Sequence, residues 1–157
     1  MGIRKELNPT VDGDEVQIPT VRYILSSDAK AALCEMFAHL KSADEYLPNI
    51  SRCVNRKKIS CLKSHDHHVF IEQLLPFAIW GFIPKNVYEP LIELSMFFRN
   101  LRAKSITQEE LDILQRRIPY TLSKLEMVFP PTFVNVMVHL VIHLAVEAKV
   151  AGPVRYR

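Results

Sequence analysis

The sequence predicts an all-α fold, an irregular bundle of about five helices that follows a polar or weakly extended N-terminal tail. Three observations favour this class. Apolar residues recur at helical spacing in several segments after residue 27. Cap residues stand before these segments, and prolines or glycines interrupt or follow them. The chain has 157 residues, 48% hydrophobic and 24% charged, which suffices to bury the core of one domain.

The first 26 residues are expected to form the tail. They are polar at first, and the later segment VQIPTVRYIL alternates loosely and is broken by Pro19, so at most one short extended segment is expected. A helix is predicted over residues 28–40, with Ser27 as its cap. Residues 41–63 lack strong periodicity, which is typical of a connector.

The next helix is predicted to begin in the histidine-rich stretch CLKSHDHHVF, residues 61–70. Ser64 would cap it, and Asp66 in its first turn suits the positive end of the helix dipole. Pro76 has no N–H to donate, so the helix is expected to bend or break there. Gly81 would help to end it.

Two capping boxes are predicted for the helices that follow. Asn86 with Glu89 would open one helix, and Thr107 with Glu110 would open the next. Each box precedes apolar residues that recur every three or four positions, as a helix that covers a core requires. Trp80, which precedes both boxes, is expected in the core.

The last helix is expected to follow Pro130 and Pro131, with Thr132 as its cap, and to run to about Ala148. It is apolar on nearly every side, which is typical of a central buried helix. Gly152 would stop it.

Two groups of residues are candidate metal ligands. His65, Asp66 and His68 lie within four positions, and imidazoles with a carboxylate suit zinc or another divalent ion. His139 and His143 stand four residues apart on a predicted helix, a spacing with which two imidazoles bind a metal, although the pattern is not HExxH. Each group alone favours a structural interpretation, since one segment cannot aim enough ligands at one ion. A metal site is therefore expected only if the two groups meet in the bundle.

A basic cluster is the candidate nucleic-acid contact. No acidic residue lies between Ser51 and His65, and such clusters neutralise phosphates. A solvated loop is the favoured alternative, and the net charge of +3 is too small to indicate nucleic acid. The cluster consists of Arg52, Arg56, Lys57, Lys58 and Lys63.

Cysteine usage and hydropathy indicate an intracellular protein. The three cysteines form no CxxC pair, so reduced thiols are expected. The N-terminus lacks the apolar core of a signal peptide. The longest apolar run is interrupted by polar residues and is shorter than the ~20 residues that span a bilayer, so no membrane association is expected.

Five sequence blocks carry a family resemblance. They are LKSHDHHVFIEQLLP (62–76), GFIPKNV (81–87), LIELSMFFRNL (91–101), KLEMVFPPTFVNVMVHLVIHL (124–144) and EAKVAGPVRYR (147–157). In this order they resemble a plant domain of uncharacterised function in proteins of CACTA-type (En/Spm-like) DNA transposons, where it usually lies C-terminal to the transposase region.

The resemblance implies a domain organisation and a setting. Residues 1–26 would be the tail, 27–60 a lead-in helix and basic connector, and 61–157 a transposase-associated domain of unknown function. The last part is expected to be truncated at its C-terminus, because related sequences continue beyond it. A transposase or DNA would be the partner, in the nucleus. The related domain usually has a cysteine in place of His67, which weakens any metal site that depends on His67.

The expected function is interaction with protein or DNA, without catalysis by this chain alone and without a cofactor. One alternative is a metal-binding fragment of a transposase or nuclease that uses Asp66 and the histidines. Another is a helical scaffold kept for its fold, or a transposon relic without function. The sequence predicts no oligomeric state.

Overall fold

Helices dominate the structure, a computed structural model that describes residues 10–12, 15–17, 24–40, 50–55, 58–130, 133 and 135–152. The predicted all-α class is confirmed, since strands occur in this part of the chain only as two short hairpins. The elements are β1 (Thr10–Asp12), β2 (Glu15–Gln17), α1 (Ser27–Ala38), the 3-10 helix η2 (Ile50–Cys53), β3 (Val54–Asn55), β4 (Lys58–Ile59), α2 (Ser64–Val69), the π-helix η3 (Phe70–Leu74), α3 (Leu75–Ala78), α4 (Lys85–Leu101), α5 (Gln108–Val128) and α6 (Val136–Ala151).

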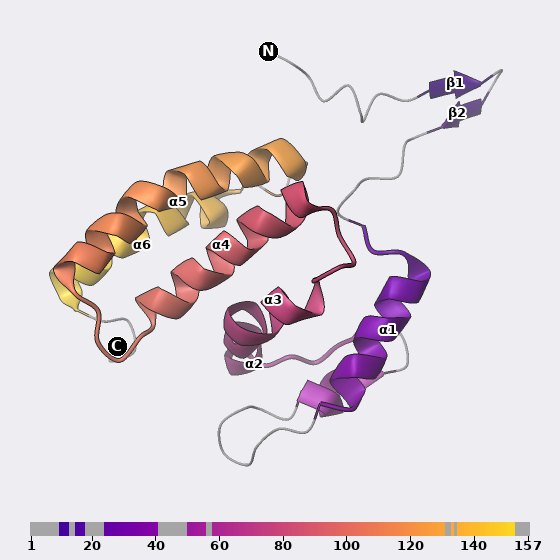
Figure 1. Cartoon of the computed structure of the whole chain (residues 1–157), viewed down its shortest axis with the longest axis horizontal. Helices are drawn as coiled ribbons and strands as arrows, with labels where there is room; N and C mark the ends of the chain where they lie inside the picture. Colours follow the sequence, from indigo (N-terminus) through magenta and orange to yellow (C-terminus); the bar gives the residue numbers. More distant parts are fainter. Residues whose placement is uncertain are drawn as a thin grey trace.

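The helices form two groups, each around its own core (Figure 1). In the larger group α5 contacts both α4 and α6. The smaller group is made of α1, η2, the β3–β4 hairpin and the continuous segment α2–η3–α3. Both η3 and α3 also contact α4, so this segment joins the two groups. The larger core consists of Phe97, Leu101, Leu111, Ile118, Leu122, Leu125, Val141, Ala145 and Ala148.

The N-terminal segment contains one more strand than predicted. β1 and β2 pair as an antiparallel hairpin in which Val11 stands opposite Val16. The expectation of at most one extended segment is therefore wrong, because a second strand is needed to satisfy the hydrogen-bonding groups of the first.

The cap of α1 lies one residue before the predicted one. Ser26 is extended, with a ψ of 162°, and its hydroxyl accepts a hydrogen bond of 3.1 Å from the Ala29 N–H. The predicted cap, Ser27, is the first residue of the helix. The helix buries Leu33 and Phe37 in the smaller core.

The irregularity predicted at Pro76 is the π-helical segment η3, which directly precedes the short helix that contains this proline. In the π register Pro76 would donate to the carbonyl of Ile71, but proline has no N–H. The Ser95 hydroxyl of α4 replaces that donor, at 2.6 Å from the Ile71 oxygen. One turn on, the Tyr88 hydroxyl donates to the Pro76 carbonyl at 3.3 Å. Gly81 follows with φ of 77°, a conformation that glycine adopts without strain and that suits the end of the segment.

The capping box predicted at Asn86 is wrong. Pro84 precedes the first residue of α4, and Asn86 already lies inside the first turn. A capping box needs an N–H on the cap residue, and proline has none. The Glu89 carboxylate instead lies 3.4 Å from the ammonium of Lys85.

The prediction that Trp80 lies in the core is also wrong, because 71% of the residue is exposed. Its ring packs edge to face against the ring of Tyr88, with 5.3 Å between the ring centroids.

The capping box predicted for α5 is confirmed. The Thr107 N–H donates to the Glu110 carboxylate at 2.8 Å, and the Glu110 N–H donates to the Thr107 hydroxyl at 3.2 Å. The helix then continues for 21 residues through Pro119.

The last helix begins later than predicted, and it ends directly before Gly152, the predicted stop. The Asn135 side chain accepts from the Val138 N–H at 3.2 Å, directly before the first residue of α6. Thr132, the predicted cap, lies outside the described residues. Gly152, with φ of 78°, follows the last helical residue as expected.

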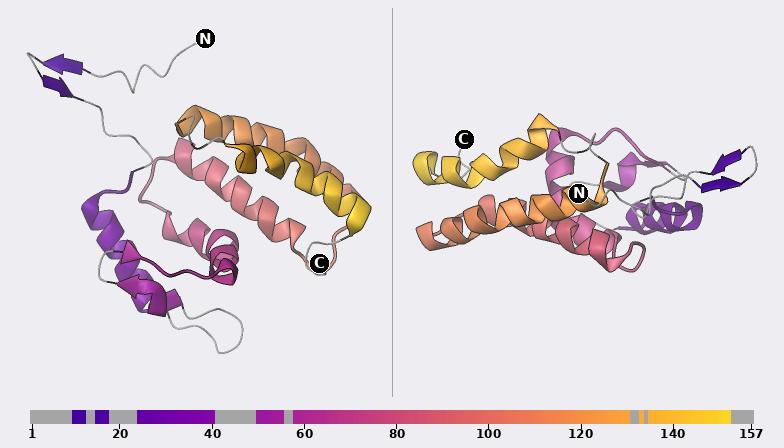
Figure 2. Two further views of the ribbon diagram at one scale, coloured as in Figure 1. Left: turned by 180° about the vertical axis from the view of Figure 1, so that it is seen from behind. Right: turned by 90° about the horizontal axis from the view of Figure 1, so that it is seen from above.

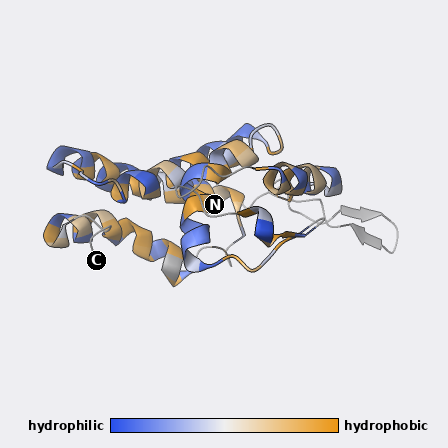
Figure 3. Ribbon diagram, turned by 90° about the horizontal axis from the view of Figure 1, so that it is seen from below, coloured by the Kyte–Doolittle hydropathy of each residue, from blue (hydrophilic) through white to orange (hydrophobic). Residues whose placement is uncertain are grey.

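The prediction that this last helix is central and buried is wrong. α6 lies at the edge of its group, beside α5 (Figure 2), and buries one side only. In Figure 3 its ribbon, beside the mark C, is hydrophobic over most of its length. Among the described residues, no helix combines the length and the apolar character needed to cross a bilayer.

Candidate functional site

Asp66 is held inside the fold. Only 2% of it is exposed, and its Oδ2 accepts hydrogen bonds from the Lys63 N–H at 2.9 Å and from the Arg52 guanidinium at 2.5 Å. Lys63 is the residue before the first turn of α2, so the prediction that Ser64 caps this helix is wrong. The Lys63 N–H, together with Arg52, keeps the pKa of the Asp66 carboxyl below its usual range.

The basic cluster is partly used by the fold. Arg52 is paired with Asp66, whereas Lys58 and Lys63 are exposed. Arg56 and Lys57 lie outside the described residues. The nucleic-acid hypothesis therefore stays a prediction. Within the described residues, Lys58 and Lys63 are the exposed lysines of the cluster that could contact phosphates.

Two histidines of the stretch 61–70 lie on the surface at the start of α2. His65 and His68 are exposed, and the His68 Nδ1 lies 3.8 Å from a carboxylate oxygen of Glu72. Glu72 is largely buried and accepts a hydrogen bond of 2.7 Å from Arg102, which follows α4. Sequence reasoning missed Glu72, although its position four residues after His68 is a pairing signal for a helix.

His139 and His143 are exposed on α6, and their ring centroids lie 5.8 Å apart in an edge-to-face arrangement. The prediction that these two imidazoles lie close together on one helix is therefore confirmed. α6 contacts α5, whereas α2 contacts η3. In the described part of the chain, no group of three or more histidine, cysteine or acidic side chains is placed so that it could hold a metal ion. The metal hypothesis stays a prediction without a common cluster to support it.

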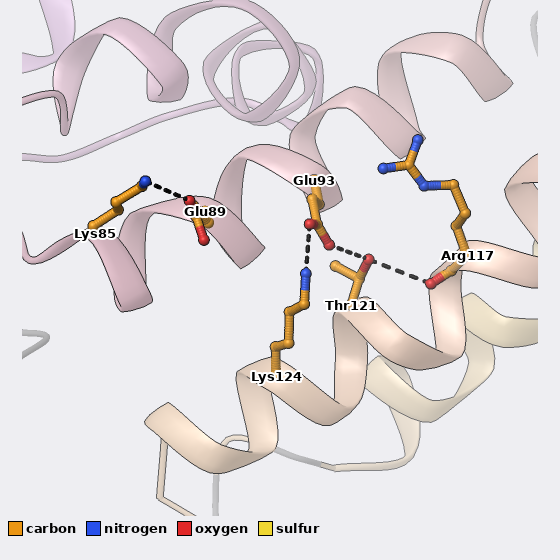
Figure 4. A network of polar contacts seen from close by, with 6 residues as sticks. All are labelled: Lys85, Glu89, Glu93, Arg117, Thr121 and Lys124. Atoms are coloured by element: carbon orange, nitrogen blue, oxygen red, sulfur yellow. Dashed lines mark hydrogen bonds and ion pairs between the residues drawn. The ribbon is translucent and has the colours of Figure 1, made fainter.

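A polar network joins α4 to α5 (Figure 4). The Glu93 carboxylate accepts from the Lys124 ammonium at 2.6 Å and from the Thr121 hydroxyl at 2.8 Å. Burial alone would raise the pKa of Glu93, but the hydrogen bonds from Lys124 and Thr121 outweigh it and the pKa lies below its usual value. The network fixes how the two helices slide and rotate against each other.

A pocket of about 270 Å³ opens beside this network, between α4 and α5. Its lining mixes apolar and polar side chains, among them Glu93, Met96, Asn100, Ser105, Glu110 and Arg117. Both of its carboxylates are engaged, Glu93 with Lys124 and Glu110 with Thr107. The two carboxylates of the pocket therefore take part in contacts within the fold.

A second polar contact fixes the rotation of α6 on α5. The Lys149 ammonium donates to the carboxylate of Asp112 and, at 2.5 Å, to the amide oxygen of Gln115. The bond from Lys149 also lowers the pKa of the Asp112 carboxyl. With Lys149 directed to α5, the opposite side of α6 faces away from the bundle.

The carboxyl pKa values bear on what these groups can do chemically. Asp66, Glu93, Glu110 and Asp112 all have a lowered pKa, because each accepts hydrogen bonds that favour the charged form. A general base that works near neutrality needs a shift in the opposite direction. These four acids are arranged to hold the fold.

A family model described as a domain of unknown function (DUF4218) matches residues 101–157. The match begins at the last residue of α4 and covers α5 and α6. These residues lie within the segment 61–157, for which the sequence resemblance implies a domain of unknown function. No curated protein and no solved structure matches the chain.

Proposed function

We propose that the chain is a transposon-derived, transposase-associated helical domain that acts in the nucleus by contacting a partner, without catalysis of its own. The observation that carries the proposal is a set of large exposed apolar side chains, on a domain whose four carboxyls of lowered pKa are held by hydrogen bonds within the fold. Aromatic residues and methionine are enriched in protein–protein interfaces, so a protein partner is the first expectation. The side chains are Phe77 (77% exposed), Trp80 (71%), Tyr120 (74%) and Met127 (77%).

The sequence resemblance is the reason for proposing the transposase as a partner, and the basic cluster is the reason for proposing DNA. Lys58 and Lys63 are exposed, and the backbone N–H of Lys63 donates to Asp66, the partner of Arg52. DNA contacts made by such lysines weaken steeply as salt rises.

The test is a binding titration of the purified full chain with the transposase protein of the same element, and separately with a DNA duplex at several salt concentrations. We expect saturable binding to the transposase that Trp80→Ala weakens by roughly tenfold, since aromatic anchors carry much of the energy of an interface. Ser123→Ala, an exposed position on α5, is the matched control.

The DNA titration decides the second contact. If the basic cluster contributes, Lys57→Glu with Lys58→Glu abolishes a salt-dependent signal. Absence of binding to both the transposase and DNA contradicts the proposed function.

A further inference from the structure

Two cysteines flank the β3–β4 hairpin. Cys53 ends η2 directly before β3, and Cys61 follows β4 after a single residue, Ser60. The Ser60 N–H donates to the Cys53 carbonyl at 2.8 Å, which extends the pairing of the two strands by one step. Opposite residues in such a hydrogen-bonded pair have Cα atoms about 5.5 Å apart. Cys61 is the neighbour of the residue opposite Cys53, so the hairpin brings the two cysteines close together.

The thiol of Cys53 is directed to residue 61. Its Sγ donates a hydrogen bond of 3.5 Å to the carbonyl oxygen of Cys61. A carbonyl oxygen lies roughly 2.4 Å from the Cα of its own residue, so this sulfur is within about 6 Å of the Cys61 Cα. Disulfides join residues whose Cα atoms are about 4.4–6.8 Å apart. A rotation of the two side chains with a small shift of the backbone can therefore bring the sulfurs into bonding distance.

The backbone of Cys61 is left-handed. Its φ is 62°, and it is the one residue other than glycine with a positive φ in the described part of the chain. A side chain is strained in this conformation. In an extended strand Cys61 would face away from the side of Ser60 and Cys53, because neighbouring residues alternate. The left-handed turn ends this alternation, so the strand geometry does not hold the two cysteine side chains on opposite faces.

The two thiols differ in their access to solvent. Cys61 is exposed, whereas only 4% of Cys53 is exposed, so an oxidant in solution reaches Cys61 first. The pKa of Arg52 is raised by a side-chain contact with Cys53 and, next in size, by Asp66, so a guanidinium lies beside the buried thiol. A cation in this place favours the attack of a sulfur on another sulfur.

We propose that Cys53 and Cys61 form a reversible disulfide when the chain meets hydrogen peroxide. In the first step the Cys61 sulfur attacks one peroxide oxygen, the O–O bond breaks, and the other oxygen leaves as water with the thiol proton. In the second step the Cys53 sulfur attacks the Cys61 sulfur, the S–O bond breaks, and the hydroxyl leaves as water with the Cys53 proton. Two thiols are oxidised to one disulfide, and one peroxide is reduced to two waters.

The bond would close residues 53–61 into a loop around the hairpin. The hairpin carries Lys58 of the basic cluster, and Arg52 with its partner Asp66 adjoins the loop at Cys53. A cross-link removes open conformations of the segment that it encloses, so the oxidised hairpin should open less often than the reduced one. These contacts are independent of the transposase and of DNA, so the disulfide and the proposed function can fail separately.

The first test is peptide mapping of the full chain. The reduced protein is treated with hydrogen peroxide, free thiols are blocked with N-ethylmaleimide, and trypsin digestion follows without reductant. Trypsin places Cys34, Cys53 and Cys61 in three separate peptides, which are residues 31–41, 53–56 and 59–63. Mass spectrometry should find 53–56 joined to 59–63, and dithiothreitol should separate them again. Cys34→Ser is the matched control, since it removes another buried thiol and should leave this joined peptide intact.

The second test assigns the order of the steps. In Cys53→Ser the oxidised Cys61 has no partner thiol, so dimedone should label it as a sulfenic acid. In Cys61→Ser the buried Cys53 should react with peroxide roughly tenfold more slowly than Cys61 does, because oxidation follows exposure. Melting curves followed by circular dichroism verify that both variants are folded.

The third test asks whether the fold selects the pair. In urea the chain loses these contacts, and peroxide should then also join the Cys34 peptide to the other two. A folded wild-type chain whose peptides 53–56 and 59–63 stay separate, or which gives the same mixture as the unfolded chain, overturns the proposal. Dimedone labelling of Cys53 in Cys61→Ser as fast as that of Cys61 in Cys53→Ser overturns the assigned order of the two sulfurs.

Discussion

Asp66 stands in the most histidine-rich stretch of the chain and has the residue type of a metal ligand or catalytic acid. Its surroundings give it a different task. One of its oxygens accepts from the N–H that precedes α2 and from Arg52, fourteen positions earlier in the chain. The carboxylate thereby caps a helix and ties the connector to it.

The first prediction concerns acid stability. The pKa of Asp66 is lowered in the folded state, so its contribution to stability is present above the unfolded pKa of about 3.9 and is lost as the pH falls through the folded value. Asp66→Asn should lower the melting temperature by roughly 5 °C at pH 7, because Arg52 loses its charged partner. Thermal melts between pH 2 and pH 7 should show the difference from wild type shrinking at the acid end. Asp28→Asn, an exposed acid in the first turn of α1, is the control, and equal effects of both changes would contradict the assigned role.

Ser95 is the second residue whose role is visible only in the fold. Just 1% of Ser95 is exposed. Its hydroxyl donates a hydrogen bond to the Ile71 carbonyl, to which Pro76 cannot donate because it has no N–H. Ser95→Ala should cost about 1–3 kcal/mol, because a buried carbonyl is left unpaired. Urea unfolding measures this cost, with Ser123→Ala on the surface as the control. A loss no larger than that of the control would show that the π-helical segment does not need this hydroxyl.

At the scale of elements, the cap of α5 is the best-supported local signal. The Thr107 hydroxyl and the Glu110 carboxylate satisfy each other's backbone N–H groups at the start of a 21-residue helix. Thr107→Ala should destabilise the protein by about 1 kcal/mol in urea unfolding, and Thr107→Ser should restore most of this loss. Equal stability of the alanine and serine variants would mean that the hydroxyl contributes nothing.

The helical elements were predictable because their signals are local. The Thr107 box and the glycine stop of α6 depend on residues within a few positions of each other, and both are confirmed. The box at Asn86 failed because Pro84 competes for the start of the same helix. The prediction that α6 is buried on every side was wrong for another reason. Its composition predicts apolar contacts on every side, but only the fold decides that α5 covers one side and leaves the other exposed.

The candidate sites were less predictable than the helices, because their contacts join distant positions. The sequence marked Asp66 and Arg52 for different roles, and the structure pairs them. Glu72 escaped notice within an apolar run, yet it joins Arg102 thirty positions later. The His139–His143 pair was found because its spacing is local.

At the scale of the whole molecule, metal analysis tests whether the two histidine groups share one site. His65 and His68 lie at the start of α2, which contacts η3, whereas the His139–His143 pair lies on α6, which contacts α5. Elemental analysis of the purified chain should therefore find no zinc that depends on both groups. One ion per chain, lost in both His65→Ala and His143→Ala, would instead support the site predicted between the two groups.

The division into two cores also bears on where this domain can be cut. The family match starts at Leu101, at the end of α4, yet α4 supplies Phe97 and Leu101 to the core that α5 and α6 complete. A protein shortened to residues 101–157 would leave the partners of Phe97 facing water, and it should aggregate or stay unfolded when expressed. The segment that matches the family model is thus smaller than the segment that folds. A fragment intended to be soluble should therefore begin before Lys85, the first residue of α4.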